Sequence, residues 1–282
     1  MDHLDTVIFP VAGLGTRMLP ATKATPKELL PVYDTPLLQF AIDEALAAGA
    51  RRIVLVSHPD KPAIEAYLRH DKALEKNLAE AGKDDLLAAV EASTLPDGIE
   101  LYIVMQEEQL GLGHAVLCGA AHAGEGPVGV ILPDDLILGE PCLAEMTAAY
   151  DPVSMKSLVA AQTVAPHQVS RYGIFDCDES LDAPALPSSR FVEKPEPAEA
   201  PSRLAAVGRY ILDPMIFDVL RGTDKGAGGE IQLTDAIARL GGLHAFRFSG
   251  TRYDCGNKDG LVDATLAVQS ERRRAHLGVA AE

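Results

Sequence analysis

The sequence TVIFPVAGLGTRMLP, at positions 6–20, decides how the chain begins to fold. Its first half, Thr6–Ala12, is a short apolar run rich in β-formers, and the glycines after it predict a tight loop. An alanine-rich amphipathic stretch, Leu37–Ala48, and a second apolar run, Arg52–Ser57, come next. This order predicts a strand, a loop, a helix and a second strand.

The alternation of apolar runs with amphipathic stretches continues to residue 164. Strands separated by helices imply right-handed crossovers. The predicted fold class is therefore α/β, with a Rossmann-like, mixed and mainly parallel sheet flanked by helices. Ligands of such sheets collect beyond the carboxyl ends of the strands. The further predicted strands are Leu101–Gln106, Val128–Leu132 and Ser157–Val164, and the further predicted helices are Gly113–Ala123 and Leu143–Tyr150.

The pattern changes after Pro166. Short β-rich pieces alternate with proline-rich and acidic stretches, which predicts a smaller, more antiparallel region. Asp182–Ser189 and Glu193–Pro201 are expected to be surface loops, because several prolines in so few residues oppose a strand ladder. An amphipathic helix is expected over Lys258–Arg274. The β-rich pieces are Tyr172–Asp176, Arg190–Glu193 and Leu204–Leu212.

The composition is that of a globular protein with a strong negative charge. Of 282 residues, 47% are hydrophobic and 23% are charged, and 41 acidic against 25 basic side chains give a net charge of −16. This charge disfavours a general attraction to nucleic acids or anionic membranes, so we expect neither as a partner. Any phosphate group that the protein binds must be held by locally placed groups.

The sequence predicts a cytoplasmic protein with free thiols. It has no charge-free window of about twenty apolar residues. Its beginning, MDHLD, lacks the basic and apolar regions of a secretory signal. The cysteines are widely spaced and form no C-x-x-C pair, so buried free thiols are favoured over a zinc site or disulfides. They are Cys118, Cys142, Cys177 and Cys255.

Two glycines and an arginine follow the first predicted strand. Gly13 and Gly15 allow backbone N–H groups to approach an anion, and Arg17 adds a guanidinium group that can bind phosphate oxygens. Met18 stands where the dinucleotide motif G-x-G-x-x-G requires its third glycine, and the sequence contains no P-loop motif. The loop therefore predicts a phosphate cradle of another kind.

A second cation lies ten positions after Arg17. Lys27 belongs to the string PKELLP at positions 26–31, where prolines stiffen the backbone on both sides. In an acidic protein, cations gathered beside a glycine turn favour a phosphate-binding role for Lys27. Lys23 is closer to Arg17, but we interpret it as a solvent-exposed loop lysine.

The strings GLGTRMLPATK at positions 13–23 and PKELLP at 26–31 resemble the signature of the sugar-1-phosphate nucleotidylyltransferases. Further blocks resemble that family in the same order, from about residue 6 to residue 270. Any one block could arise by chance, whereas all of them in sequence make the resemblance specific. The blocks are Gln106, GLGHAVLC at 111–118, LPD at 132–134, YG at 172–173, VEKP at 192–195, VGRY at 207–210, GEIQLTDAI at 229–237 and DCGN at 254–257.

The resemblance implies the nucleotide-diphospho-sugar transferase fold and one reaction. A phosphate oxygen of glucose 1-phosphate attacks the α-phosphorus of UTP, pyrophosphate leaves in line, and UDP-glucose is formed, with Mg²⁺ as the cofactor. The nucleophile is already anionic, so the protein must align two polyanions and neutralise charge rather than remove a proton. His114 is therefore expected to have a packing or capping role. A homo-oligomer, either a dimer or a tetramer, is also implied.

The resemblance also divides one continuous catalytic domain into three parts. Residues 1–165 would form the nucleotide-binding region, and residues 166–248 the sugar-phosphate-binding region. Residues 249–282 would supply a metal-facing turn and the C-terminal helix.

The catalytic charges follow from the same resemblance. Arg17 and Lys27 would hold the triphosphate and the leaving pyrophosphate. Asp134 comes after a buried run and a proline, so its carboxylate is expected at the carboxyl end of a strand, and the resemblance makes it the magnesium ligand. Asp254 resembles a second metal-facing aspartate, but its turn also suits a structural Asx role, and both interpretations stay open. A metal role is disfavoured for Asp135.

Backbone and amide groups are implied for the nucleotide. Gln106 ends a predicted strand, and its amide offers the donor and the acceptor that the imide edge of uracil requires. The resemblance assigns Gln106 to the base and Gly111 to a place where the base stacks on the backbone. Ala12, Gly13 and Gly15 would contribute backbone contacts to the nucleoside and its phosphates.

The sugar phosphate is assigned to the second half of the chain. The resemblance gives Glu193 to the sugar hydroxyls and Lys194 to the sugar phosphate. Neighbours on a regular strand point to opposite faces, so both can contact one ligand only at a strand end or a bulge, which Pro195 favours. Gly173 and Gly208 would let the backbone approach the hexose.

Two alternatives remain open at this point. The phosphate-binding residues would also suit a thymidylyltransferase or another nucleotidylyltransferase acting on a different sugar 1-phosphate. A non-catalytic protein that binds a nucleotide sugar and regulates a partner is the second alternative. The complete set of Arg17, Lys27, Asp134 and Lys194 favours an enzyme, because a binding protein does not need all of these charges.

Overall fold

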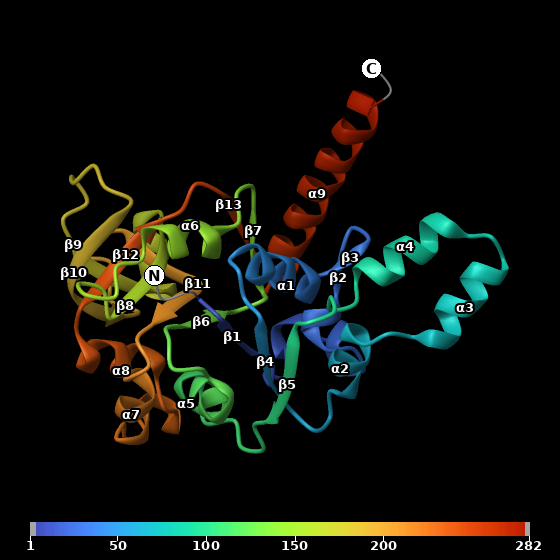
Figure 1. Ribbon diagram of the computed structural model, residues 1–282. Helices are drawn as coiled ribbons and strands as arrows, with labels where there is room; N and C mark the ends of the chain where they lie inside the picture. Colours follow the sequence, from blue (N-terminus) through green and yellow to red (C-terminus); the bar gives the residue numbers. More distant parts are fainter. Residues whose placement is uncertain (1–3, 280–282) are drawn as a thin grey trace.

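Within residues 4–279, which the computed structural model describes, nine strands form one mixed sheet (Figure 1). For residue 227 and residues 276–279 only the backbone is described. The strand order is β5-β4-β1-β6-β11-β8-β12-β10-β9. The strands are β1 (Thr6–Pro10), β4 (Arg52–Ser57), β5 (Glu100–Met105), β6 (Val128–Ile131), β8 (Ser157–Thr163), β9 (Gly173–Cys177), β10 (Ala185–Glu193), β11 (Leu204–Leu212) and β12 (Leu243–Arg247).

Helices connect these strands much as the sequence predicts. The expected helix at Leu37–Ala48 ends one residue earlier, and the expected helix at Gly113–Ala123 is an α-helix that continues as a 3-10 turn. The α-helices are α1 (Leu37–Ala47), α2 (Pro62–Leu68), α3 (Lys72–Glu80), α4 (Asp84–Ala92), α5 (Leu112–Cys118), α6 (Cys142–Ala149), α7 (Ile216–Arg221), α8 (Leu233–Leu240) and α9 (Lys258–Val279). The 3-10 turns are η1 (Thr16–Met18), η2 (Ala21–Lys23), η3 (Lys27–Leu29), η4 (Gly119–His122), η5 (Pro166–Arg171) and η6 (Ala227–Gly229).

The amino-terminal half of the sheet is parallel, and both of its faces are covered. β1 pairs in parallel with β4 on one side and with β6 on the other, and β5 pairs in parallel with β4. Val7 and Phe9 pack into a core cluster with α1 and α6, whereas Ile8 packs into a second cluster with α5, α7 and α8. A strand buried on both faces needs no alternation of polar and apolar residues, which explains the continuous apolar run of β1.

β11 joins the two halves of the sheet. It runs antiparallel to β6 on one side and to β8 on the other. Its pairing with β8 shifts between Ala206 and Tyr210, around Gly208. Beyond β8, β12 is parallel, and β10 and β9 are antiparallel, as expected for this half. The sheet is therefore continuous across residue 166, where the sequence pattern changes.

The predicted surface loop at Asp182–Ser189 is wrong in its second half. Ala185, Leu186 and Pro187 belong to β10 and pair with β12. The pairing of β10 with β9 begins at Ser188 and is then interrupted by a register shift. Pro187 thus has a strand partner on one side only, and a missing N–H group is tolerated at such a position.

Two small sheets complete the site end of the molecule. β7 (Asp135–Leu138) pairs antiparallel with β13 (Thr251–Asp254), so that Asp254 lies opposite Asp135. β2 (Pro31–Val32) pairs with β3 (Thr35–Pro36) directly after η3. These short pairings fix the loops that follow β1 and β6.

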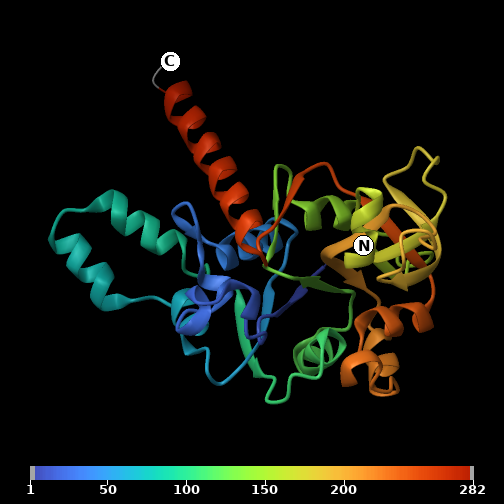
Figure 2. The same ribbon diagram turned by 180° about the vertical axis from the view of Figure 1, so that it is seen from behind.

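Two helical elements extend away from the body of the protein (Figures 1 and 2). One is the pair α3 and α4, and the other is α9, which begins at Lys258 as predicted and continues to Val279. Val268 of α9 is buried against Val32 and Leu37, whereas Val262 and Leu266 are exposed. Among the helices of residues 4–279, none is long and apolar enough to cross a membrane.

Candidate active site

The loop after β1 turns sharply at Gly15. This residue adopts a left-handed conformation, with φ of 65°, just before η1 begins. Thr22 Oγ1 donates a hydrogen bond of 2.8 Å to the Gly15 carbonyl oxygen. A Cβ atom on Gly15 would lie 3.1 Å from Lys27 Cβ. Glycine therefore permits both the turn and the close packing of Lys27.

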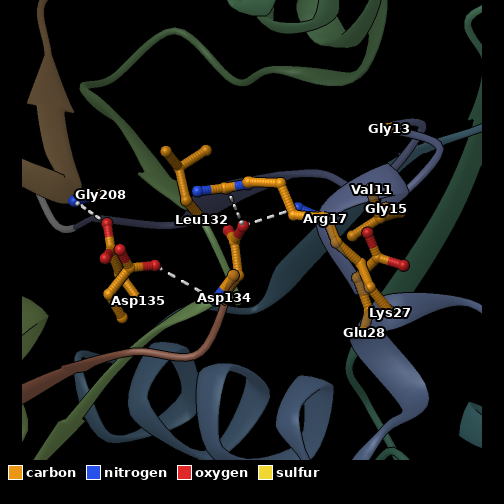
Figure 3. Close-up of polar contacts among 12 residues, drawn as sticks. Val11, Gly13, Gly15, Arg17, Lys27, Glu28, Leu132, Asp134, Asp135 and Gly208 are labelled. Carbon is orange, nitrogen blue, oxygen red and sulfur yellow. Dashed lines mark hydrogen bonds and ion pairs between the residues drawn. The ribbon is translucent and has the colours of Figure 1, made fainter. Parts of the chain in front are cut away.

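Lys27 and Arg17 converge on Asp134 (Figure 3). Lys27 Nζ lies 2.6 Å from Asp134 Oδ2, and Arg17 Nη2 lies 3.7 Å from the same oxygen. The side chains of Lys27 and Asp134 are 19% and 18% exposed, whereas that of Arg17 is 63% exposed. Asp134 follows β6 by three residues, so its carboxylate stands at the carboxyl end of that strand, as the sequence predicts. The three residues form one charge cluster.

The charges of this cluster stabilise one another. Burial disfavours the carboxylate of Asp134, but the charge and hydrogen bond of Lys27, together with Arg17, hold its pKa below the usual value. Burial likewise disfavours the ammonium of Lys27, but Asp134 and Glu28 hold its pKa above the usual value. Both groups are therefore ionised at neutral pH, as anion binding and metal binding require. Lys23, in contrast, is exposed on η2.

The cluster borders a cavity of about 500 Å³. Residues of the loops after β1, β5 and β6 line it, so it lies at the carboxyl ends of parallel strands, as predicted. It collects most of the residues that the sequence assigns to the nucleotide. The lining residues are Pro10, Ala12, Gly13, Arg17, Lys27, Gln106, Gln109, Gly111, Leu112, Ala115, Leu132, Asp134 and Glu230.

Gln106 is almost fully buried directly after β5. Its Nε2 atom donates to the Gly111 carbonyl oxygen at 3.3 Å and lies 2.9 Å from His114 Nδ1. These contacts fix the plane of the amide beside the cavity. Gly111 has a φ of 93°, and a Cβ atom on it would lie 2.7 Å from Glu230 Cβ. His114 therefore orients Gln106 in addition to packing within α5, a role that the sequence did not predict.

A second cavity, of about 260 Å³, adjoins the first. Leu112 and Leu132 line both of them. Four residues that the sequence assigns to the sugar phosphate line the second cavity, namely Gly173, Glu193, Lys194 and Gly208. Thr234, from α8, also lines it, and its buried hydroxyl has no hydrogen-bond partner within the described residues.

Glu193 and Lys194 lie at a strand end, as the sequence predicts. Glu193 is the last residue of β10, and Lys194 has a positive φ of 46°. This change of conformation brings both side chains to the same cavity, where Lys194 Nζ lies 3.2 Å from Glu193 Oε1. The Lys194 side chain is 62% exposed. Its ammonium group is thus available to a ligand without breaking a buried contact.

The glycines of the second cavity are also required by packing. A Cβ atom on Gly173 would lie 1.8 Å from an atom of the Phe191 ring. A Cβ atom on Gly208 would lie 2.6 Å from Leu132 Cβ and 2.8 Å from Asp135 Oδ2. Neighbouring side chains therefore occupy part of the space that these two glycines leave.

Asp135 is engaged in contacts within the protein. Its Oδ2 accepts the N–H of Gly208 at 2.9 Å, and its Oδ1 accepts Arg252 Nε at 2.6 Å. Burial raises the pKa of Asp135 despite the charge of Arg252. Arg252 also donates to the Tyr172 hydroxyl at 3.2 Å. This arrangement gives Asp135 a structural role in the wall of the second cavity.

Asp254 and Asp134 both lie next to Gly256. A Cβ atom on Gly256 would lie 2.9 Å from Asp134 Oδ2 and 3.1 Å from Asp254 Oδ1, so the two carboxylates border one small space. Asp254 Oδ1 accepts the N–H of Gly256 at 3.2 Å, which is an Asx turn. Its Oδ2 lies 3.5 Å from an Arg171 nitrogen. The structural role is thus present, and the geometry also leaves a carboxylate beside Asp134.

The pair Asp134 and Asp254 suits a magnesium ion. Mg²⁺ prefers oxygen ligands and is usually held by one or two carboxylates together with substrate phosphates. In the described residues, no group of three or more His, Cys, Asp or Glu side chains is arranged to hold a metal. A two-carboxylate site that is completed by phosphates is consistent with that finding.

Sequence reasoning missed several charged residues of the site. Arg171 and Arg252 line the second cavity. Arg209 is 1% exposed, forms an ion pair with Glu44, and donates to the carbonyl oxygens of Leu132 and Asp135, which flank the segment bearing Asp134. Arg209 is the charged residue in the otherwise apolar run Leu204–Leu212, and a buried charge needs a partner. This signal in the sequence could have identified Arg209 as a residue with a specific role.

Comparison with known proteins explains this arrangement. The sequence model of the nucleotidyl transferase family matches residues 7–271 of the chain. The chain belongs to this nucleotidyl transferase family. The resemblance inferred from the sequence motifs is therefore confirmed, together with the α/β fold class.

Relatives of this nucleotidyl transferase match nearly its whole length. UTP–glucose-1-phosphate uridylyltransferase 1 of Staphylococcus saprophyticus is 44% identical over 92% of this chain and 90% of the relative. The UTP–glucose-1-phosphate uridylyltransferase of Bacillus subtilis is 43% identical over 98% of this chain and 96% of the relative.

Solved structures agree with this nucleotidyl transferase in fold. A UDP-glucose pyrophosphorylase in complex with UDP-glucose has a TM-score of 0.84 and 37% identity, over 95% of this chain and 99% of that chain. A UTP-bound UGPase from Acinetobacter baumannii has a TM-score of 0.87 and 38% identity, over 94% and 93% of the two chains.

Proposed function

We propose that this protein transfers the uridylyl group of UTP to glucose 1-phosphate and so forms UDP-glucose and pyrophosphate. The observation that carries the proposal is the cluster of Lys27, Arg17 and Asp134 beside two adjoining cavities. Relatives that match nearly the whole chain are named for this activity, and similar structures hold UTP or UDP-glucose. One cavity would hold the nucleotide and the other the sugar phosphate.

The proposed reaction is an in-line displacement at the α-phosphorus of UTP. A phosphate oxygen of glucose 1-phosphate forms the new P–O bond, and the bond to the β-phosphate oxygen breaks. Arg17 and Lys27 bind the phosphate oxygens and neutralise the charge that develops on pyrophosphate. Alignment of the two substrates would lower the barrier by roughly 7–11 kcal/mol.

The nucleoside would lie along the wall of the larger cavity. The buried amide of Gln106 would face the uracil edge, and the base would stack on the backbone of Gly111. Ala12 and Gly13 offer backbone contacts, and Gly15 shapes the loop that carries them.

Asp134 and Asp254 are the residues that would hold Mg²⁺. When bound there, the ion adds positive charge beside the triphosphate. Lys27, 2.6 Å from Asp134, would bind phosphate oxygens beside that site.

The smaller cavity would hold glucose 1-phosphate. Lys194 binds its phosphate, and Glu193 accepts hydrogen bonds from sugar hydroxyls. A hydroxyl in the wrong position would leave the carboxylate unpaired, which distinguishes epimers. Gly173 and Gly208 form the floor beneath the hexose.

We propose that three regions of the chain serve different parts of the reaction. Residues 1–165 would serve the nucleotide, residues 166–248 the sugar phosphate, and residues 249–282 the metal and the C-terminal helix. The ends of the first and last regions, residues 1–3 and 280–282, lie outside the described residues.

The exposed Val262 and Leu266 of α9 support a homo-oligomer, which light scattering would test. The cytoplasm is the proposed compartment, because the reaction draws on the cellular UTP pool.

The test is a pyrophosphate-release assay with purified protein, UTP, glucose 1-phosphate and Mg²⁺. We expect release that requires both substrates and stops when EDTA removes the metal. A parallel assay with dTTP distinguishes uridylyl from thymidylyl transfer, and equal rates would overturn the preference for UTP. Binding of UDP-glucose without any pyrophosphate release would instead support the regulatory alternative.

A further inference from the structure

A buried lysine contacts the loop that forms one wall of the nucleotide cavity. Lys61 follows β4 and stands just before α2. Its Nζ atom lies 2.7 Å from the Val11 carbonyl oxygen, 2.5 Å from the Gly13 carbonyl oxygen and 3.0 Å from Glu28 Oε2. An ammonium group has three N–H donors, and these three acceptors use all of them.

The acceptors belong to the two segments that carry the phosphate-binding groups. Val11 and Gly13 lie in the loop after β1, and Glu28 directly follows Lys27 in η3. The side chains of Lys61 and Glu28 are 9% and 0% exposed. Burial lowers the pKa of Lys61 and raises that of Glu28, and each charge is compensated by the other. A contact of this kind holds its geometry, because loss of one partner leaves a buried charge unpaired.

The contacts also determine where the loop amides point. In a trans peptide the C=O and N–H groups point in opposite directions. Because the Val11 and Gly13 carbonyl groups are turned toward Lys61, the N–H groups of Ala12 and Leu14 are turned away from it. Ala12 lines the nucleotide cavity. Without Lys61, these peptide groups could rotate and place carbonyl oxygens where a phosphate or nucleoside has to bind.

We propose that Lys61 is a positioning residue for nucleotide binding and transfer. It fixes the peptide groups between residues 11 and 14, and through Glu28 it fixes the segment that carries Lys27. The inference rests on the uridylyl transfer proposed above. It adds a residue that touches no substrate and acts through the loop.

A second lysine in the same protein provides a matched control. Lys156 Nζ lies 2.8 Å from Asp213 Oδ2 and 3.4 Å from the Pro152 carbonyl oxygen. It therefore combines an ion pair with a carbonyl contact, as Lys61 does. Asp213 follows β11 at the end where Leu212 pairs with Val128, whereas Gly208 and the site lie toward the other end. Loss of Lys156, whose side chain is 37% exposed against 9% for Lys61, removes the same kinds of contact from a more exposed position, far from the loop after β1.

The test compares Lys61→Met, Glu28→Gln, the double variant and Lys156→Met. For Lys61→Met we expect kcat to fall about 100-fold, as for a misplacement of about 1 Å, with a tenfold weaker binding of UTP by calorimetry. The KM for glucose 1-phosphate should change by less than about threefold, because its cavity is not held by Lys61. Lys156→Met should keep wild-type kcat and UTP affinity.

The double variant separates positioning from charge compensation. It has no unpaired buried charge, so it also serves if Lys61→Met alone does not fold. If Lys61 positions the loop, the double variant stays as impaired as Lys61→Met, while Glu28→Gln, which keeps the carbonyl contacts, is milder. Recovery of the double variant to near wild-type kcat and UTP affinity would overturn the proposal and leave Lys61 as the counter-ion of Glu28.

Hydrogen exchange keeps this test independent of the proposed function. In the substrate-free protein, amides of residues 11–16 should exchange faster in the double variant than in wild type, with no such change in Lys156→Met. If the wild type released no pyrophosphate, uridylyl transfer would be refuted, and faster exchange would still support fixation of the loop. Unchanged exchange would overturn the role of Lys61 whatever the wild-type activity.

Discussion

Lys27 and Lys194 carry the same charge in two adjoining cavities, but the protein holds them differently. The Lys27 side chain is 19% exposed, and its Nζ lies 2.6 Å from Asp134. The Lys194 side chain is 62% exposed, and its Nζ lies 3.2 Å from the neighbouring Glu193. Ordering a lysine side chain costs up to about 2 kcal/mol of conformational entropy. The folded protein has already met this cost for Lys27 but not for Lys194.

The difference indicates that the lysine of the nucleotide side is preorganised, whereas the lysine of the sugar side is ordered only when a ligand binds. On the nucleotide side, Lys27 and Lys61 are held by carboxylates and carbonyl groups before any phosphate arrives, whereas Arg17 is 63% exposed and lies 3.7 Å from Asp134. Substitutions there should change both stability and turnover. Substitutions of the exposed side chains Lys194 and Glu193 on the sugar side should change the binding of one substrate and leave the folded protein almost as stable as before.

The largest effect is expected for Asp134→Asn. Pyrophosphate release should fall at least about 1,000-fold, because the variant loses the carboxylate that would hold the metal. The free energy of unfolding should also fall, by about 2 kcal/mol, because Lys27 loses its partner in a mostly buried pair. Asp213→Asn, which breaks the pair with Lys156, is the control and should lower stability without loss of turnover. Turnover above a tenth of wild type would contradict the assignment.

The same variant gives a pH dependence. The folded protein holds the pKa of Asp134 below its usual value, so this carboxylate stabilises the folded state above the unfolded pKa of about 3.8. As the pH falls through the lowered folded pKa, this contribution is lost. The difference in unfolding free energy between wild type and Asp134→Asn should therefore be complete above about pH 5 and shrink below pH 4. A constant difference across this range, by urea denaturation, would show that the pair is not the cause.

Lys194→Met should weaken the binding of glucose 1-phosphate and leave UTP binding unchanged. We expect the KM for glucose 1-phosphate to rise roughly 10- to 100-fold, because one charge-assisted contact to phosphate is worth about 1.5–3 kcal/mol. UTP affinity by calorimetry and the melting temperature should stay close to wild type, since the side chain is exposed. Glu193→Gln should likewise weaken sugar binding only. Equal loss of UTP affinity in either variant would move that residue to the nucleotide side.

The sequence predicted the long strands and the charge cluster beside the nucleotide cavity. Arg52–Ser57 and Leu204–Leu212 are strands with the predicted bounds, because mainly apolar runs of this length suit strands buried on both faces. The family resemblance also implied that Arg17, Lys27 and Asp134 belong to one site, and the structure brings the three side chains together. Contacts that depend on local sequence and on strand ends were accessible from the sequence.

Contacts between distant short strands were not accessible. Arg252 and Asp135 are 117 positions apart and meet because β13 pairs with β7. Each of these strands has four residues, too few to show a clear periodicity. The strand at Pro187 was missed for a different reason. Proline generally opposes a strand ladder because it lacks an N–H donor. Pro187 pairs with a strand on one side only, so no partner strand requires the missing N–H.

Gly173→Ala tests how tightly the sugar side is packed. A methyl group there would overlap the Phe191 ring, so the ring must move and the free energy of unfolding should fall by about 1–3 kcal/mol. Phe191→Leu in the same chain should recover part of that loss, because the smaller side chain leaves room. A double-mutant cycle by urea denaturation measures the coupling. Additive effects would mean that the ring does not limit this position.

The smallest effect is expected for Thr234→Val, which sharpens the contrast between the two cavities. The buried Thr234 hydroxyl lines the sugar cavity and has no partner in the described part of the chain. Removal of an unpaired hydroxyl should leave stability unchanged or slightly higher, whereas loss of one hydrogen bond to the sugar should raise the KM for glucose 1-phosphate about fivefold, near 1 kcal/mol. Ser157→Ala, which removes a second buried hydroxyl that has no partner among the described residues, is the control and should not change this KM. If Thr234→Val lowered stability with no change in KM, the hydroxyl would serve the fold, and the sugar side would be preorganised as well.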